Sequence, residues 1–240
     1  MLATPLFRTS VFALALLFSA SLAGTAHAQN FQFGGHLMLG VPQGEFADNL
    51  DTQGFGGDLF FGVGLGNAPV VLGIEGGFMI YGSESRRVPF STTIPDVTVE
   101  VTTTNNFVNG LLVLRFQPQV GSFRPYADAV AGINYLSTET QVDDEDGFDD
   151  RAVFQSTNFD DLGFAYGVGG GVAFKLFSST RNDGSPFDFF LDTRVRYLIG
   201  SETEYLREGD IERTPTGIRF TPSESKTDVL FFQLGVNVVF

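Results

Sequence analysis

The sequence contains no cysteine and no tryptophan, and only 14 of its 240 residues are lysine or arginine. Without cysteine the chain has no disulfide framework, no thiolate nucleophile, no cysteine-ligated metal and no lipidated cysteine anchor. Aspartate and glutamate number 28, so the formal net charge is −14 at pH 7. A chain this acidic lacks the basic surface that phosphate backbones require, and we therefore expect no nucleic acid partner.

Long apolar runs are also missing, except near the start of the chain. Arg8 precedes the apolar stretch VFALALLFSASLAG at 11–24, and AHA at 26–28 fits the small-x-small rule for signal-peptide cleavage. Because the run is short for a spanning helix, a cleaved export signal is favoured over a retained anchor. We predict a signal peptide at 1–28 and one mature domain at 29–240. No later stretch reaches about 18 uninterrupted apolar residues, which excludes a helical membrane bundle.

The sequence instead alternates with a period of two, as the last thirteen residues, DVLFFQLGVNVVF, show. Apolar residues occupy every even position from Leu230 to Phe240, whereas Gln233, Gly235 and Asn237 stand at odd positions. Successive side chains of a strand point to opposite faces, so this pattern predicts a β-strand with one continuous apolar face. The same alternation predicts eight strands, at 31–41, 55–65, 70–81, 107–117, 125–136, 162–176, 187–199 and 228–240.

The predicted connections alternate in length along the chain. Three are short, at 66–69, 118–124 and 178–186, and four are longer, at roughly 42–54, 83–97, 137–161 and 201–225. Short turns at one end and long loops at the other are typical of outer-membrane barrels. The sequence therefore predicts an all-β fold: an eight-stranded antiparallel up-and-down transmembrane β-barrel with short periplasmic turns and four longer extracellular loops.

A soluble β-sandwich would also alternate, with its apolar face inward. Against that alternative, the polar face of the segment 163–173 carries only glycine and alanine. Small residues suit the crowded interior of a narrow eight-stranded barrel, whereas a solvent-facing surface has no need of them. The apolar faces then form a belt toward lipid. We expect aromatic girdles at its edges, from Phe31, Phe55, Tyr81, Tyr135, Phe164, Phe174, Phe187 and Phe240.

Charges on the predicted inner face balance. Four acids and four bases fall at mid-strand depth, as a desolvated interior requires, and Asp188 lies near the rim. We predict that they form a polar network filling the lumen, with Gln233, Asn237 and Asn134 as further hydrogen-bonding partners, and that no water-filled pore remains. The charged members are Asp58, Glu75, Arg115, Asp128, Lys175, Asp192, Arg194 and Arg196.

Over its whole mature region the chain resembles the small eight-stranded outer-membrane barrels of the OmpA/OmpX-like family. The resemblance rests on the export signal, the eight alternating segments, RPYADAVAGINY at 124–135 and the final strand. It implies the outer membrane of a Gram-negative-type bacterium and recognition by the barrel-assembly machinery. The family's terminal assembly signal, polar-x-Gly-x-x-apolar-x-aromatic, is met by Gln233, Gly235, Val238 and Phe240.

The predicted loop at 138–161 concentrates negative charge, with nine acidic residues against Arg151. An EF-hand frame fails, because placing Gly147 at its sixth position puts Val142 and Val153 where carboxylates are needed. We interpret the loop as a solvated acidic segment. Weak binding of divalent ions, and cation bridging to lipopolysaccharide, stay open as hypotheses.

Enzymatic function has little support in the residues. His36, the one histidine after residue 28, falls mid-strand on the predicted inner face, and no serine or acid stands beside it in the sequence. We interpret it as a hydrogen-bonded packing residue rather than a catalytic base. The glycine-rich stretch at 167–174 lacks the lysine and strand–loop–helix setting of a phosphate-binding loop. We expect no enzyme activity, no cofactor and no metal site.

Two classes of function stay open. The first is a monomeric structural or surface-interaction protein with a filled lumen, surrounded by outer-membrane lipid and lipopolysaccharide. The second is a narrow porin-like conduit for ions or small hydrophobic molecules. A filled and charge-balanced lumen favours the first, although a fold by itself does not determine function.

Overall fold

The computed structural model describes residues 30–50, 52–91, 94–144, 154–180, 186–206, 211–214, 217–220 and 222–240. The predicted signal peptide at 1–28 lies outside these residues. Eight of the described strands close into one barrel: β1 (Phe31–Pro42), β2 (Gly54–Gly64), β3 (Val70–Ser91), β4 (Ile94–Phe116), β5 (Phe123–Asp144), β6 (Phe154–Thr180), β7 (Pro186–Gly200) and β12 (Val229–Val239).

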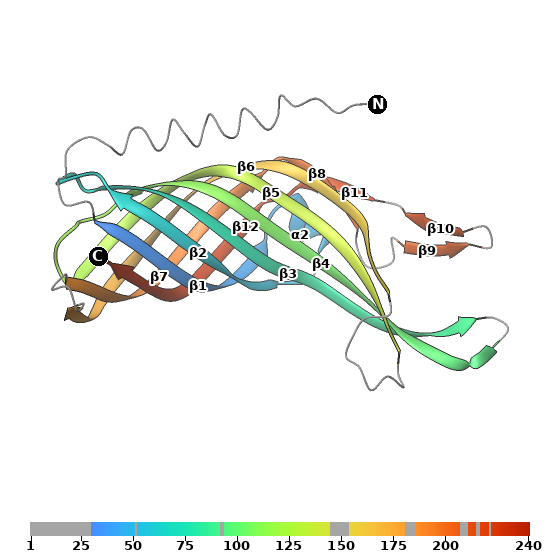
Figure 1. The fold of residues 1–240 in the computed structure, drawn as a ribbon. Coiled ribbons are helices and arrows are strands. Elements are labelled where there is room, and N and C mark those ends of the chain that lie inside the picture. Colours follow the sequence, from blue (N-terminus) through green and yellow to red (C-terminus); the bar gives the residue numbers. More distant parts are fainter. Residues whose placement is uncertain are drawn as a thin grey trace, which may run out of the picture.

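Each barrel strand pairs antiparallel with the strands that precede and follow it, and β12 pairs with β1 to close the sheet (Figure 1). In this closing pair Phe33 lies opposite Val238, and the Phe240 amide donates a 2.9 Å hydrogen bond to the Phe31 carbonyl. The predicted eight-stranded antiparallel barrel is confirmed. Closure satisfies the backbone groups that an open sheet would expose at its edges.

Short connections join the barrel strands at the end where the chain terminates, which we call the turn end (Figure 1). The connection after β2 contains Gly66, with φ 54°, and the connection after β4 contains Gly121, with φ 103°. Glycine reaches this left-handed region of backbone space without the clash that a Cβ atom causes. The two turns therefore reverse the chain within a few residues.

The opposite end, the loop end, differs from the sequence-based prediction. The expected loops at 83–97 and 137–161 are largely strand, because β3 and β4 continue as a hairpin to Ser91 and Ile94 and β5 and β6 also extend (Figure 1). Alternation of apolar and polar residues could not reveal these extensions, since neither face needs to be apolar beyond the hydrocarbon. The sequence VTVEVTTT at 97–104 does carry a different strand signal, its β-branched residues.

The other two expected loops also contain regular structure. The first connection holds a short helix, α2 (Glu45–Asn49). The last long connection contains two small antiparallel hairpins, β8 (Glu202–Tyr205) with β11 (Ser223–Lys226) and β9 (Ile211–Thr214) with β10 (Gly217–Phe220). The four longer connections are therefore at the predicted end of the barrel, but they contain regular structure that the alternation did not reveal.

Inside and outside of the barrel follow the predicted alternation. Leu37, Leu112 and Val168 point outward and are 63 %, 64 % and 66 % exposed, whereas inward positions of the same strands are buried. A water-soluble protein rarely leaves so many large apolar side chains uncovered. This outer surface therefore has the composition of a lipid-facing belt, and the polar faces of the strands form the lumen.

Seven of the eight aromatic residues expected at the edges of the belt do point outward or lie half-buried at the barrel surface. Tyr81 contradicts the prediction, because only 1 % of it is exposed and its ring packs in the lumen 5.8 Å from that of Phe46. Its odd position in β3 is shared with Glu75 and Met79, both of which face inward. The alternation of the strand thus overrides the preference of an aromatic residue for the membrane edge.

Apolar side chains fill the lumen at the loop end. Phe46 of α2 is fully buried there and makes an edge-to-face contact with Tyr205, at 5.3 Å between ring centroids. Thr52 tethers the same connection by donating a 2.5 Å hydrogen bond to the Tyr81 carbonyl. We call this set the apolar plug: Met38, Phe46, Met79, Tyr81, Phe107, Leu136, Leu198, Tyr205, Val229 and Phe231.

Candidate functional site in the barrel lumen

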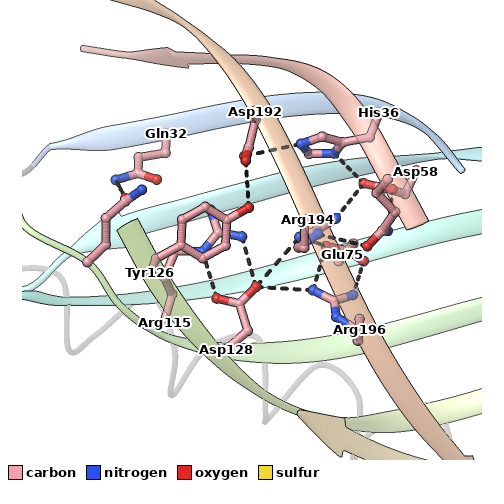
Figure 2. A network of polar contacts seen from close by, with 12 residues as sticks. Gln32, His36, Asp58, Glu75, Arg115, Tyr126, Asp128, Asp192, Arg194 and Arg196 are labelled. Atoms are coloured by element: carbon pink, nitrogen blue, oxygen red, sulfur yellow. Dashed lines mark hydrogen bonds and ion pairs between the residues drawn. The ribbon is translucent and has the colours of Figure 1, made fainter. Parts of the chain in front are cut away.

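On the turn-end side of the apolar plug, the lumen contains one continuous set of polar side chains (Figure 2). Every barrel strand except β6 contributes to it. All of them are at most 6 % exposed, and each occupies an inward position of its strand. We call this set the lumen network: His36, Asp58, Glu75, Arg115, Tyr126, Asp128, Asp192, Arg194, Arg196 and Gln233.

Arg194, on β7, lies at the centre of the lumen network. Its Nη1 donates to Glu75 Oε2 at 2.8 Å, its Nη2 to Asp58 Oδ1 at 3.2 Å, and its Nε to Gln233 Oε1 at 2.8 Å. Gln233 in turn donates to Asp58 Oδ2 at 2.7 Å. One guanidinium group therefore connects β7 and β12 with β2 and β3, two pairs of strands that are far apart in sequence.

The other two arginines complete the centre of the network. Arg115 donates from Nε and Nη2 to the two carboxylate oxygens of Asp128, at 2.8 and 2.9 Å. Its guanidinium also lies between two rings, 4.5 Å from the centroid of Phe60 and 3.8 Å from that of Tyr126. Arg196 bridges Glu75 and Asp128, and its Nη2 lies 3.3 Å from Asp128 Oδ2. Bidentate and stacked geometry of this kind is specific to arginine.

His36 takes part in the network, between two carboxylates (Figure 2). Its Nδ1 lies 2.7 Å from Asp58 Oδ1, its Nε2 lies 3.3 Å from Asp192 Oδ2, and the Tyr126 hydroxyl donates to Asp192 Oδ1 at 2.6 Å. No acid stands beside His36 in the sequence, and the fold brings both of these acids to it from other strands. Pairing supplies both neighbours, since His36 lies opposite Asp58 across β1 and β2 and opposite Gly235 across β1 and β12.

Gly235 of the predicted assembly signal sits between His36 and Asp192 in the sheet. It pairs with His36 on one side and with Asp192 on the other. A Cβ atom at this position would lie 2.6 Å from the Cα of His36 and 2.7 Å from its Cδ2. The missing side chain therefore leaves the space in which the imidazole reaches across β12 to Asp192.

Seven of the eight predicted charged residues meet in the lumen network, and Lys175 does not. Its ammonium lies 2.6 Å from Asp188 Oδ2 near the turn end, where both side chains are partly exposed. Arg124 lies 3.7 Å from the same carboxylate, and its guanidinium is 4.4 Å from the ring centroid of Phe190. The expected balance of four bases against four acids is wrong in this respect, because depth along the barrel cannot be read from alternation.

Of the three uncharged partners expected in the network, only Gln233 joins it. Asn134 and Asn237 are buried in the lumen, but both polar side-chain atoms of Asn134 and the Oδ1 atom of Asn237 lack a hydrogen-bond partner among the described residues. The sequence also missed Tyr126 as a member. The signal that could have revealed it is its even position in β5, because Asp128 shares that position and was predicted to point inward.

Small residues of β6 make room for this network. A Cβ atom at Gly171 would lie 2.5 Å from the Tyr126 hydroxyl oxygen. This strand presents Gly167, Gly169 and Ala173 to the interior as well, and a larger side chain at Gly171 would displace the ring that stacks on Arg115. The run of small residues thus provides volume for long arginine side chains from the facing strands.

Other predicted features are only partly within the described structure. Residues 145–153 of the acidic segment 138–161 lie outside it, and so does the proposed processing site after residue 28. Among the residues that the structure does describe, no group of three or more histidine and acidic side chains has the geometry of a metal site. No helix in the described ranges is long and apolar enough to cross a membrane.

The fold and its outward apolar belt define a transmembrane β-barrel, and a comparison with protein families gives its class. A family model described as the outer membrane protein beta-barrel domain matches residues 11–240. The chain belongs to this family, and its location is the outer membrane of a Gram-negative-type bacterium. No curated protein sequence is significantly similar to it.

Solved structures of three outer-membrane proteins also align with the chain. Ail of Yersinia pestis, solved with the heparin analogue sucrose octasulfate, is 14 % identical, with 88 % of this chain and 97 % of Ail covered and a TM-score of 0.35. The neisserial surface protein NspA is 10 % identical, with coverages of 88 % and 95 % and a TM-score of 0.36. A major outer membrane protein of Thermus thermophilus is 14 % identical, with coverages of 89 % and 100 % and a TM-score of 0.42.

Proposed function

We propose that this protein is a non-conducting outer-membrane barrel whose filled lumen supports a structural or surface-interaction role. The observation that carries the proposal is the lumen network, in which Arg115, Arg194 and Arg196 are at most 1 % exposed. Arg194 and Arg196 on β7 reach across the lumen to Glu75 on β3, and Arg115 pairs with Asp128 on the neighbouring strand. A hydrated pore would leave such groups in contact with water. Buried ion pairs of this quality resist separation, because breaking one leaves an unpaired charge.

Two further layers support a closed lumen. Toward the loop end the apolar plug lies above the network, with Phe46 inserted between Tyr81 and Tyr205. Toward the turn end Gln32 donates a 3.0 Å hydrogen bond to Gln117, and Arg124 covers the ring of Phe190. An ion that entered the barrel would have to displace all three layers.

Single-channel recording on the purified protein in planar bilayers tests this proposal. We expect no steady conductance from the wild type at neutral pH. As a positive control, E75A combined with R194A removes one acid and one base from the centre of the network, so the net charge of the lumen stays the same. Intermittent conductance from that variant would show that the assay detects an opened lumen. A large steady conductance from the wild type would contradict the proposal and support the narrow conduit instead.

We also propose that the last strand is recognised by the barrel-assembly machinery through Gln233, Gly235, Val238 and Phe240. In the structure Phe240 is 43 % exposed, and its ring lies 6.3 Å from that of Phe187 at the outer surface. The Phe240 ring is accessible from outside the barrel, whereas the Gln233 side chain is hydrogen-bonded inside the lumen to Arg194 and Asp58. The aromatic terminus is therefore the part of the signal that a partner can contact after folding begins.

Deletion of Phe240 separates recognition from stability. Membrane levels of the truncated protein should fall several-fold in growing cells, while its urea midpoint after refolding in detergent changes little. V236A is the matched control, because Val236 is an outward residue of the same strand that lies outside the signal. Normal membrane levels of the truncation would contradict this role for Phe240.

The outward belt fits a monomer surrounded by outer-membrane lipid and lipopolysaccharide. Its exposed side chains are large and apolar on every barrel strand, which is the surface that acyl chains solvate. Light scattering in detergent, corrected for bound detergent, tests the monomer. A dimer mass that persists on dilution would count against it.

A further inference from the structure

Both ring nitrogens of His36 face carboxylate oxygens inside the lumen. Nδ1 lies 2.7 Å from Asp58 Oδ1 and Nε2 lies 3.3 Å from Asp192 Oδ2, and all three side chains are at most 1 % exposed. A neutral imidazole has one N–H donor and one acceptor nitrogen. A neutral ring would therefore direct a lone pair at one of the two carboxylates, with no water between them.

The two carboxylates are already engaged as acceptors by other groups. Asp58 accepts from Arg194 at 3.2 Å and from Gln233 at 2.7 Å, and Asp192 accepts from the Tyr126 hydroxyl at 2.6 Å. A carboxylate meets these donors with oxygens that only accept, so neither acid has a proton to offer the imidazole. The hydrogen-bond pattern is satisfied when His36 donates from both nitrogens.

The charges of the lumen network also indicate, independently, that His36 is protonated on both ring nitrogens. Four carboxylates, Asp58, Glu75, Asp128 and Asp192, face only three guanidinium groups, Arg115, Arg194 and Arg196. With a neutral His36 the network would hold one uncompensated negative charge out of contact with water, which is costly. Lys175 and Arg124 do not supply the missing charge, because both lie against Asp188 near the turn end and neither is paired with a carboxylate of the network.

We infer that the lumen contains a single-proton binding site at His36, and that the bound proton, shared between Asp58 and Asp192 through an imidazolium ring, neutralises the lumen network. The ionisable groups that surround this site come from every packed strand that carries one. They are Asp58 from β2, Glu75 from β3, Arg115 from β4, Tyr126 and Asp128 from β5, and Asp192, Arg194 and Arg196 from β7. On β12 the neighbours are Gln233 and Gly235, which carry no charge.

The bound proton ties the stability of the barrel to pH. The unfolded chain releases the proton near the ordinary imidazole value of about 6.5, whereas in the folded barrel the ring that carries it lies between the carboxylates of Asp58 and Asp192. Stability from this proton is therefore fully present below about pH 6.5 and is lost as the pH rises far enough to remove the proton from the folded barrel. This inference does not require the proposed non-conducting role, since a proton can occupy the site in a barrel of either kind.

Nuclear magnetic resonance of the protein isolated from membranes and labelled with ¹⁵N-histidine tests the inference directly. At pH 8 an ordinary imidazole is about 3 % protonated. We expect both ring nitrogens of His36 to show the shifts of an imidazolium at this pH, with the signal assigned by its loss in H36Q. A spectrum of a neutral tautomer at pH 8 would overturn the inference.

Urea unfolding between pH 6 and pH 9 gives a second readout. The wild-type midpoint should fall with rising pH, H36Q should have a lower midpoint with a flatter profile, and H36Q/D192N should recover part of the loss because it restores neutrality. K175Q is the matched control, since it removes one positive charge at the partly exposed Lys175–Asp188 pair, and it should keep the wild-type profile. An H36Q profile parallel to that of the wild type would overturn the inference. If H36Q fails to fold, the resonance test decides, because His36 is the one histidine after residue 28 and its signal can be assigned without the variant.

Discussion

At the scale of single residues, the lumen depends on side chains whose partners are set by strand pairing. His36 and Asp58 are 22 residues apart, and His36 and Asp192 are 156 apart, yet all three lie in contact. Gly235 permits the longer of these contacts because β12 lies between β1 and β7 and places no side chain between His36 and Asp192 at this position. A residue that resembles part of an assembly signal in the sequence therefore also has a structural task in the folded barrel.

G235A tests that task. Its Cβ would lie 2.6 Å from the Cα of His36, and overpacking of this kind costs about 1–3 kcal/mol. We expect a lower urea midpoint and a weakened imidazolium signal of His36. G76A is the matched control, because Gly76 points outward and a Cβ there would meet nothing within 4 Å. Equal midpoints for the two variants would contradict the packing role of Gly235.

At the scale of elements, α2 and the ends of the long strands differ most from the sequence-based expectation. The helix has only five residues and no side-chain cap, so local propensity does not explain it. Tertiary contact through Phe46 explains the helix, because burial of the Phe46 ring between Tyr81 and Tyr205 fixes the connection across the barrel mouth. The helix also contacts β1 and β11. One of these contacts is a hydrogen bond from the Lys226 backbone amide to the Glu45 carboxylate.

F46A should therefore loosen the loop end. Truncation of a buried phenylalanine costs about 3–5 kcal/mol, and the expected result is a lower urea midpoint together with faster proteolysis within residues 43–53. D48A is the control, because Asp48 lies in the same helix with an exposed side chain. If both variants are cleaved at the wild-type rate, Phe46 does not anchor this connection.

At the scale of the whole molecule, the barrel is inverted relative to a soluble protein. Buried charged residues occupy the middle of its interior, and large apolar residues such as Leu112, which is 64 % exposed, cover its outside. In water, polar substitution of so exposed a residue would have little effect. In a bilayer the same position faces hydrocarbon, and a charge there is expensive.

L112R makes this difference measurable. We expect a loss of stability of about 2–4 kcal/mol in lipid vesicles, because Leu112 lies near the middle of the outward belt. V120R is the control, since Val120 is 81 % exposed but lies in a turn-end connection outside the belt. Equal urea midpoints in vesicles for L112R, V120R and the wild type would mean that this face does not meet lipid.

The sequence by itself determined the alternating parts of the eight barrel strands, the faces of their side chains and the closed eight-stranded topology, but not the strand extensions and hairpins at the loop end. A period of two is a local property of the chain, and Tyr81 follows it by pointing inward although its aromatic side chain led to the wrong prediction that it lies at the outer edge. Only the tertiary structure decided how residues on different strands meet. Register and strand tilt set the depth of each residue, so Lys175 pairs with Asp188 at the rim while His36 joins Asp58 and Asp192 in the lumen network. Contacts between strands far apart in sequence depend on the closed geometry of the sheet, and no local pattern specifies them.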